Sequence, residues 1–328
     1  LGKNTTGGLN IAVGTYSMQE NLTGNNNTAV GYAALSDNTT SNNTAVGFRS
    51  LESNTTGTEN SSVGAFALDA NTTADYNTAL GYQVLTTNTT GNGNTGVGRK
   101  ALLMNSTGAN NVAVGRQALQ ENTTASNNTA VGYNTLAANT TGTQNTAVGS
   151  TALDANTTGV YNSAFGYDTL GSNTTGQANT AIGYEALDTN TTGSNNVAVG
   201  QGSLDGNTTA DHNTAIGYHS LLSNTEGFSN TAVGSLALDA NTTGDELVAV
   251  GRNALGANTT ANHNTAVGAE SFAANTTGTN NTGCGYNSGA TNTTGGNNTA
   301  IGDFALNANT TADNNTAVGY AALLTNTT

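Results

Sequence analysis

Asparagine followed by threonine is the residue pattern in this chain with the clearest chemical potential. Asn-Thr-Thr, or a close variant, returns at a fixed interval along the sequence, and Asn-x-Thr is an acceptor for N-linked glycosylation. The same asparagines could instead stack into a ladder of hydrogen-bonded amides at a corner of a repeating fold. The candidate glycosylation or ladder positions are Asn4, Asn21, Asn38, Asn54, Asn71, Asn88, Asn105, Asn122, Asn139, Asn156, Asn173, Asn190, Asn207, Asn241, Asn258, Asn275, Asn292, Asn309 and Asn326.

Three observations favour the ladder over glycosylation. Acceptors placed ~4.8 Å apart would crowd branched glycans against one another. Asn224 keeps the asparagine although Glu226 removes the acceptor pattern. A second asparagine column, four residues before a recurring glycine and broken at Leu247, is one that glycosylation would not require. We interpret the corner as a ladder, and glycosylation of these asparagines or of the adjacent threonines stays open.

Other reactive residue types form no pattern that supports catalysis or metal binding. Catalysis needs unlike side chains that converge in a pocket, whereas a repetitive chain places identical side chains in rows. His212, His219 and His263 do not recur from repeat to repeat, and uncharged residues interrupt the one aspartate column. That column contains Asp69, Asp154, Asp188, Asp205 and Asp239. We expect no catalytic residue, no cofactor and no metal site.

Rows of tyrosine and threonine suggest two further kinds of binding. Aromatic residues often follow the recurring glycine and could stack against sugars, but Arg99, Ser150 and Asp303 interrupt the row. Packing between coils at a wet edge is the preferred interpretation. Threonine rows on a flat solenoid could bind ice, which would require an exposed Thr-x-Thr face. The strand pattern offers a single threonine column.

A 17-residue period positions all these side chains. Nineteen glycines, from Gly14 to Gly319, mark the repeat, with one 16-residue spacing between Gly31 and Gly47. A short fixed period is typical of a solenoid. Asn-Thr-Ala-Val predicts a short strand, the Ala-Leu segment after the glycine predicts a second one, and Asn-Thr-Thr-Gly predicts a turn. The predicted fold is an all-β, rod-like parallel β-solenoid, a β-roll or β-helix of about nineteen coils, continuous over residues 1–328.

The apolar columns predict the core and an assembly. The valine that ends the strand and the leucine that follows the glycine vary among apolar residues, so both are predicted core columns, with Cys284 as a small core residue. Both columns shrink near Cys284 and Gly289, which predicts a protease-sensitive point. Neighbouring apolar residues point to both sides of the strand, and a small coil encloses little volume. We therefore expect lateral self-association, with a trimer favoured.

Composition excludes several function classes. The net charge is −14 and only six residues are basic, so a nucleic-acid partner is not expected. The sequence holds no apolar run of the length that spans a membrane. The chain starts without methionine and stops within a repeat, so we expect it to be a segment of a longer chain.

The repeat resembles known surface-protein repeats along its whole length. The phrases Asn-Thr-Ala-Val-Gly and Asn-Thr-Ala-Ile-Gly look like the head repeats of YadA-type trimeric autotransporter adhesins. The phrase over residues 128–142 also resembles repeats of phage tail-fibre-like proteins. The unit here is longer than the usual adhesin repeat. The resemblance implies a trimeric β-roll at a cell or virion surface.

Together these features predict a non-enzymatic extracellular fibre or filament subunit whose main partner is itself, as a lateral oligomer or a polymer. The alternative is an adhesin head or tail-fibre shaft that binds a cell-surface receptor or glycan.

Overall fold

The computed structural model describes residues 2–327, which contain short β-strands and no helix. Asn162 ends an N-terminal compact unit and Ser163 begins a C-terminal one. The strands of the N-terminal unit are β1 (Ile11–Val13), β2 (Thr28–Val30), β3 (Thr44–Val46), β4 (Ser61–Val63), β5 (Thr78–Leu80), β6 (Thr95–Val97), β7 (Val112–Val114), β8 (Thr129–Val131) and β9 (Thr146–Val148). The strands of the C-terminal unit are β10 (Ser163–Phe165), β11 (Thr180–Ile182), β12 (Val197–Val199), β13 (Thr214–Ile216), β14 (Thr231–Val233), β15 (Val248–Val250), β16 (Thr265–Val267), β17 (Thr282–Cys284), β18 (Thr299–Ile301) and β19 (Thr316–Val318).

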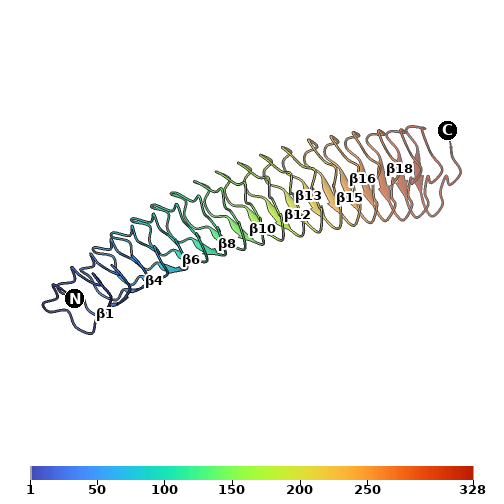
Figure 1. Ribbon diagram of the computed structural model, residues 1–328. Helices are drawn as coiled ribbons and strands as arrows, with labels where there is room; N and C mark the ends of the chain where they lie inside the picture. Colours follow the sequence, from blue (N-terminus) through green and yellow to red (C-terminus); the bar gives the residue numbers. More distant parts are fainter. Residues whose placement is uncertain (1, 328) are drawn as a thin grey trace. The chain divides into compact units, whose positions relative to one another are not determined.

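Each unit is a parallel β-solenoid (Figure 1), and each coil contributes one strand. Within a unit every strand pairs in parallel with the next one along the chain, so that Ala181 lies opposite Ala198 and Ala198 opposite Ala215. Equivalent residues of the repeat therefore stack in columns. The 16-residue spacing is absorbed without a register shift, because β2 and β3 still pair Thr28 with Thr44. The predicted all-β parallel solenoid is confirmed.

The prediction of a second strand in each coil is wrong. After the strand and its glycine, the chain makes a series of turns in which two residues take left-handed backbone conformations, such as Glu185 (φ 52°) and Leu187 (φ 56°). A strand cannot continue through such residues, because β-structure requires negative φ. A third left-handed residue, Asn195 (φ 59°), directly precedes the asparagine at the next strand. Each coil is therefore mostly turn.

The recurring glycine lies where neighbouring coils approach most closely. Gly217 has φ 138°, and a Cβ on it would lie 2.6 Å from the carbonyl carbon and oxygen of Gly234 in the next coil. Both the backbone conformation and the missing space exclude other residues. The prediction of a close backbone approach at this column is confirmed.

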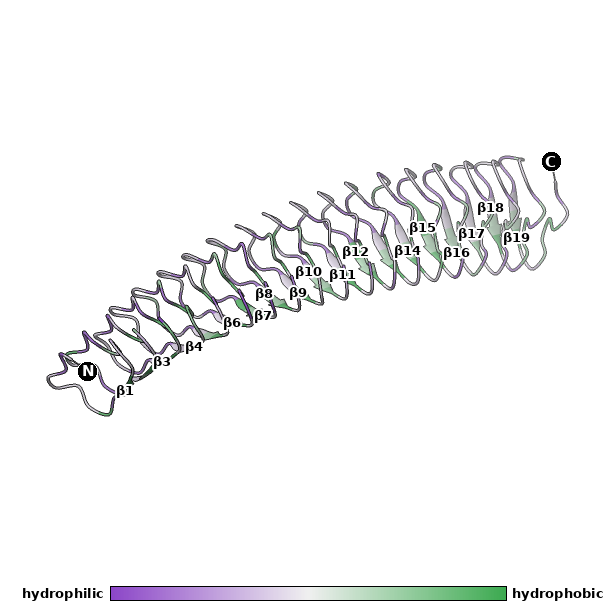
Figure 2. Ribbon diagram, viewed as in Figure 1, coloured by the Kyte–Doolittle hydropathy of each residue, from purple (hydrophilic) through white to green (hydrophobic). Residues whose placement is uncertain are grey.

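The core of each coil is narrow. It contains the central residue of the strand, which is usually alanine, a small residue and the leucine that follow the glycine, and two asparagines. Figure 2 shows the hydrophobic colour gathered on the strands and the hydrophilic colour along the turns. Leucine is the large member of this core, and burying each one contributes about 1.5–3 kcal/mol.

The valine column was predicted to be core, and that prediction is wrong. The first and third residues of each strand point outward while the central residue points inward, so Val30 is 36% exposed and Ile182 is 42% exposed. Cys284 occupies this column and is exposed, which also overturns its assignment as a core residue. Alternation along a strand places neighbours on opposite faces, so alanine and valine cannot both face the interior.

The structure removes the reason for predicting a protease-sensitive point near residue 289, because the core there is filled. Phe272, in the coil before, occupies the space that small residues vacate: a Cβ on Gly289 would lie 2.6 Å from its ring and a Cβ on Gly283 would lie 2.7 Å from it. Phe272 itself is fully buried. Val84 and Gly96 form a similar pair in the N-terminal unit, where Val84 fills the place of a missing alanine methyl. Core volume is thus conserved between adjacent coils.

Candidate functional site

The asparagines of the Asn-Thr-Thr turns, called the corner asparagines here, form hydrogen-bonded ladders within each unit. Asn190 Nδ2 donates to Asn173 Oδ1 of the coil before (2.9 Å) and to the carbonyl oxygen of Gly193 (3.0 Å). Asn190 Oδ1 in turn accepts a hydrogen bond from Asn207 Nδ2 (2.9 Å). Every corner asparagine from Asn21 to Asn309 is fully buried.

The second asparagine column links the backbones of successive coils. These residues, called the bridge asparagines here, lie directly before every strand except β15, which Leu247 precedes. Asn196 Oδ1 accepts the backbone N–H of Asn213 (2.9 Å), and Asn196 Nδ2 donates to the carbonyl oxygen of Ala210 (2.8 Å). The backbone N–H of Asn213 thereby has a hydrogen-bond acceptor, although it lies in the irregular part of the coil.

The two asparagine columns meet on the same carbonyl group. Gly193 O accepts one hydrogen bond from the corner asparagine Asn190 and one from the bridge asparagine Asn179 (2.8 Å). A carbonyl oxygen has two acceptor sites, and both are filled here. The sequence showed both columns but not that they share a carbonyl group. Asn179 lies 14 positions before Gly193 and Asn190 lies 3 positions before it, so the spacing does not indicate a common partner.

The corner ladder predicted from the sequence is confirmed, and its geometry bears on glycosylation. An N-linked glycan is attached to Nδ2, but in the folded chain this nitrogen is buried and both of its protons are donated, as at Asn190. Asn224, which lacks the acceptor pattern, makes the same bonds to Asn207 Oδ1 (3.1 Å) and Gly227 O (2.9 Å). The amide therefore serves the fold independently of the acceptor sequence.

The threonines of the corner face outward and differ from each other. Thr191 is half-buried and its hydroxyl donates to the carbonyl oxygen of Thr208 in the next coil (3.0 Å). Thr192 is exposed. Of the two linkages considered from the sequence, only the hydroxyl of the exposed threonine is sterically open in the folded chain.

The outward side of the strands, called the outer face here, consists of the first and third strand residues in each unit. The first residue is mostly threonine and the third mostly valine or isoleucine, so both columns are rich in β-branched side chains. Across the described residues no strand contains a charged side chain, although the net charge of the chain is −14. A strand face that remains in water normally carries polar and charged residues at such positions.

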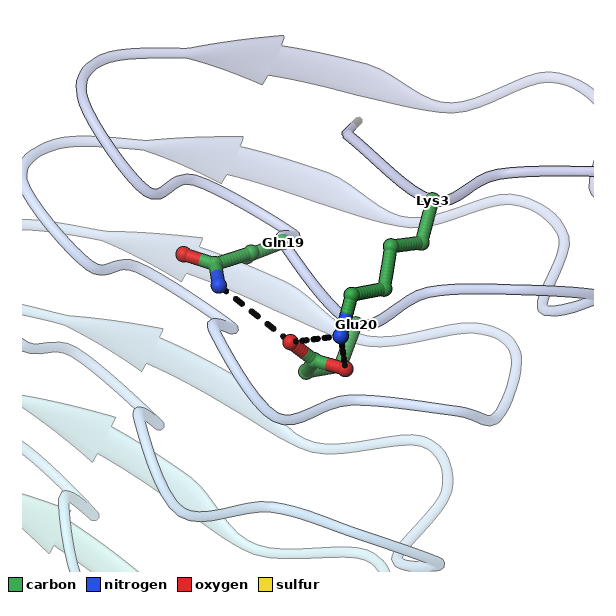
Figure 3. Close-up of polar contacts among 3 residues, drawn as sticks. All are labelled: Lys3, Gln19 and Glu20. Atoms are coloured by element: carbon green, nitrogen blue, oxygen red, sulfur yellow. Dashed lines mark hydrogen bonds and ion pairs between the residues drawn. The ribbon is translucent and has the colours of Figure 1, made fainter.

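Charged side chains lie in the turns instead, and some of them pair across neighbouring coils. Lys3 Nζ donates to both carboxylate oxygens of Glu20 (2.8 and 2.6 Å), and Gln19 Nε2 donates to Glu20 Oε1 (3.2 Å), as Figure 3 shows. The hydrogen bond from Lys3 lowers the pKa of the Glu20 carboxyl. These groups are exposed, so the pair adds little to stability.

The aspartate column contains carboxyls that burial makes harder to ionise. Desolvation raises the pKa of Asp69, Asp205 and Asp239 above the ordinary value of 3.8. Asp69 Oδ1 is buried without a hydrogen-bond partner.

Over residues 2–327, no three His, Cys, Asp or Glu side chains lie close enough to hold a metal ion together. His263 lies 3.4 Å from Glu246 at the surface, and His219 stacks on Tyr218.

No protein-family model matches this sequence, and no curated protein is significantly similar to it. In the part of the chain that the structure describes, no helix has the length and hydropathy needed to cross a membrane.

Proposed function

We propose that this chain is a structural subunit of an extracellular fibre or filament, and that copies of the chain associate side by side through the outer face. The observation that carries the proposal is the apolar third column, which is partly or fully exposed in every strand and holds no charged residue. Contiguous exposed apolar surface in a soluble protein marks an interaction site. A second copy of the chain presents the same uncharged face and would bury it.

The repeat also supports a structural role. Identical coils supply identical interactions at every level, and no cavity is present among the described residues. We propose a trimer as the favoured assembly, located at a cell or virion surface, because the resemblance to trimeric adhesin repeats points the same way. The function proposed here requires no catalytic residue.

Light scattering on purified chain and two matched variants tests the proposal. Val233→Lys with Val250→Lys places charges on the outer face of adjacent coils, whereas Thr243→Lys with Thr260→Lys adds the same charges at exposed corner threonines of those coils. We expect wild type and the corner variant to have about three times the 32.6 kDa chain mass, and the face variant to be monomeric with an unchanged circular dichroism spectrum. A monomeric wild-type chain, or a face variant that still assembles, would exclude the proposal.

A further inference from the structure

Aromatic rings, four of them exposed and Phe66 half-buried, form a continuous row over the first coils of the N-terminal unit. This aromatic row consists of Tyr16, Tyr32, Phe48, Phe66 and Tyr82, one ring from each successive coil. Neighbouring ring centroids are 5.6, 5.3, 5.2 and 6.3 Å apart along the row. Packing between coils, as predicted from the sequence, therefore occurs, and the rings stabilise one another.

The row is kept even where the repeat position changes. Tyr32, Phe48 and Tyr82 directly follow the recurring glycine, but in two coils that position holds Thr15 or Ala65 and the ring moves to the next residue, as Tyr16 or Phe66. In the C-terminal unit Phe304 likewise lies beside Asp303 and contacts the rings of Tyr286 and Tyr320. Within these coils the ring therefore changes its position in the repeat but keeps its place in the row.

Mutual packing leaves much of each ring in water. Tyr16 is 55% exposed, and Tyr32, Phe48 and Tyr82 are each 45–46% exposed. The described residues enclose no pocket, so the row cannot surround a small molecule. An open row that extends over five coils instead suits a chain-like ligand that lies along it and contacts several rings at once.

The chemistry of the row selects among chain-like ligands. The net charge of −14 disfavours a polyanion, and the one arginine in contact with the row, Arg49 near Phe66, is ion-paired with Glu52. Tyrosine offers an apolar ring and a hydroxyl together, and a sugar offers an apolar C–H face ringed by hydroxyls. We propose that the aromatic row binds a neutral polysaccharide chain.

Affinity electrophoresis through gels that contain neutral polysaccharides tests this inference directly. The panel contains hydroxyethylcellulose, xylan, glycol chitin and soluble starch, with alginate as the polyanion. In Tyr32→Ser with Phe48→Ser, the new residue is one that Ser150 and Ser235 already place after the glycine, so the fold should tolerate it. The control is Tyr76→Asn, which removes a 60% exposed tyrosine outside the row and introduces the residue found there in Asn26 and Asn110.

We expect at least one neutral polysaccharide to retard the wild-type chain, and the row variant to bind it about tenfold more weakly or worse. Tyr76→Asn should bind as wild type does. No retardation by any neutral polysaccharide, retardation by alginate alone, or equal loss in the control variant would overturn the inference. Light scattering on the same samples reports assembly separately, so failure of this inference and failure of the proposed fibre role are distinguishable.

Discussion

At the residue scale, buried asparagines fill part of the core that apolar side chains fill in most small folds. A 17-residue coil encloses too little volume for a large hydrophobic core, and irregular backbone leaves many polar groups to satisfy. Corner and bridge asparagines solve both problems, because they fill space and nearly all of them, such as Asn190 and Asn196, donate to a carbonyl group in their own or the next coil. Each such hydrogen bond contributes about 1 kcal/mol, and each coil has several.

Replacing one corner asparagine should therefore destabilise its neighbours. In Asn190→Ala, Asn207 Nδ2 loses one of its two acceptors and Gly193 O loses one of its two donors, which should cost about 1–3 kcal/mol. Thr192→Ala, two residues away but exposed, should change stability by less than about 0.5 kcal/mol. Hydrogen exchange of the amides over residues 173–210 measures the difference. Equal protection in both variants would show that the ladder contributes nothing to stability.

At the scale of the coil, the core packing of each coil depends on its two neighbouring coils. Each coil contacts the one before and the one after it, so a residue that is too large in one coil can be matched by one that is too small in the next. Phe272 with Gly289 and Val84 with Gly96 are two such matches. A coil whose sequence departs from the repeat is therefore not for that reason less stable than its neighbours.

A double-mutant cycle tests the match between Phe272 and Gly289. Gly289→Leu restores the usual residue but places it against the Phe272 ring, so the variant should lose about 1–3 kcal/mol. Phe272→Leu alone should also destabilise, because it opens a cavity. The double variant reproduces the leucine pair found in other coils, although Gly283 still lacks the usual methyl group, so its loss of stability in urea should be smaller than the sum of the two single losses. If the two single effects simply add, the pair is not coupled.

At the scale of the whole molecule, the ionisation of buried carboxyls makes the stability of the fold depend on pH. The chain has a net charge of −14, and burial disfavours the ionised form of Asp69, Asp205 and Asp239. A carboxyl with a raised pKa in the folded state binds a proton more readily when folded than when unfolded. In the pH window above 3.8, up to the raised values, folding therefore takes up protons and stability falls as pH rises.

Mild acid should consequently stabilise this protein. We expect a higher thermal midpoint at about pH 4.5 than at about pH 7, opposite to the usual loss of stability in acid. Asp205→Asn should reduce the difference between the two midpoints, because it removes one group that titrates in this window. The exposed Lys3–Glu20 pair works in the opposite direction, since its carboxyl has a lowered pKa. Identical midpoints at the two pH values would contradict the assignment of these aspartates as desolvated.

The sequence alone determined the parallel solenoid, the glycine column and the corner ladder, because a strict period forces equivalent residues into columns whose composition shows their role. It could not decide which side of the strand faces inward: alanine and valine are both apolar, and only the three-dimensional path of the coil shows that alanine fits the narrow interior and valine does not. The second strand was wrong for a similar reason, since left-handed leucines such as Leu187 look like strand residues in sequence. Tertiary structure also decided that both asparagine columns share one carbonyl and that Phe272 fills its neighbour's space, because these contacts join residues from different parts of the coil.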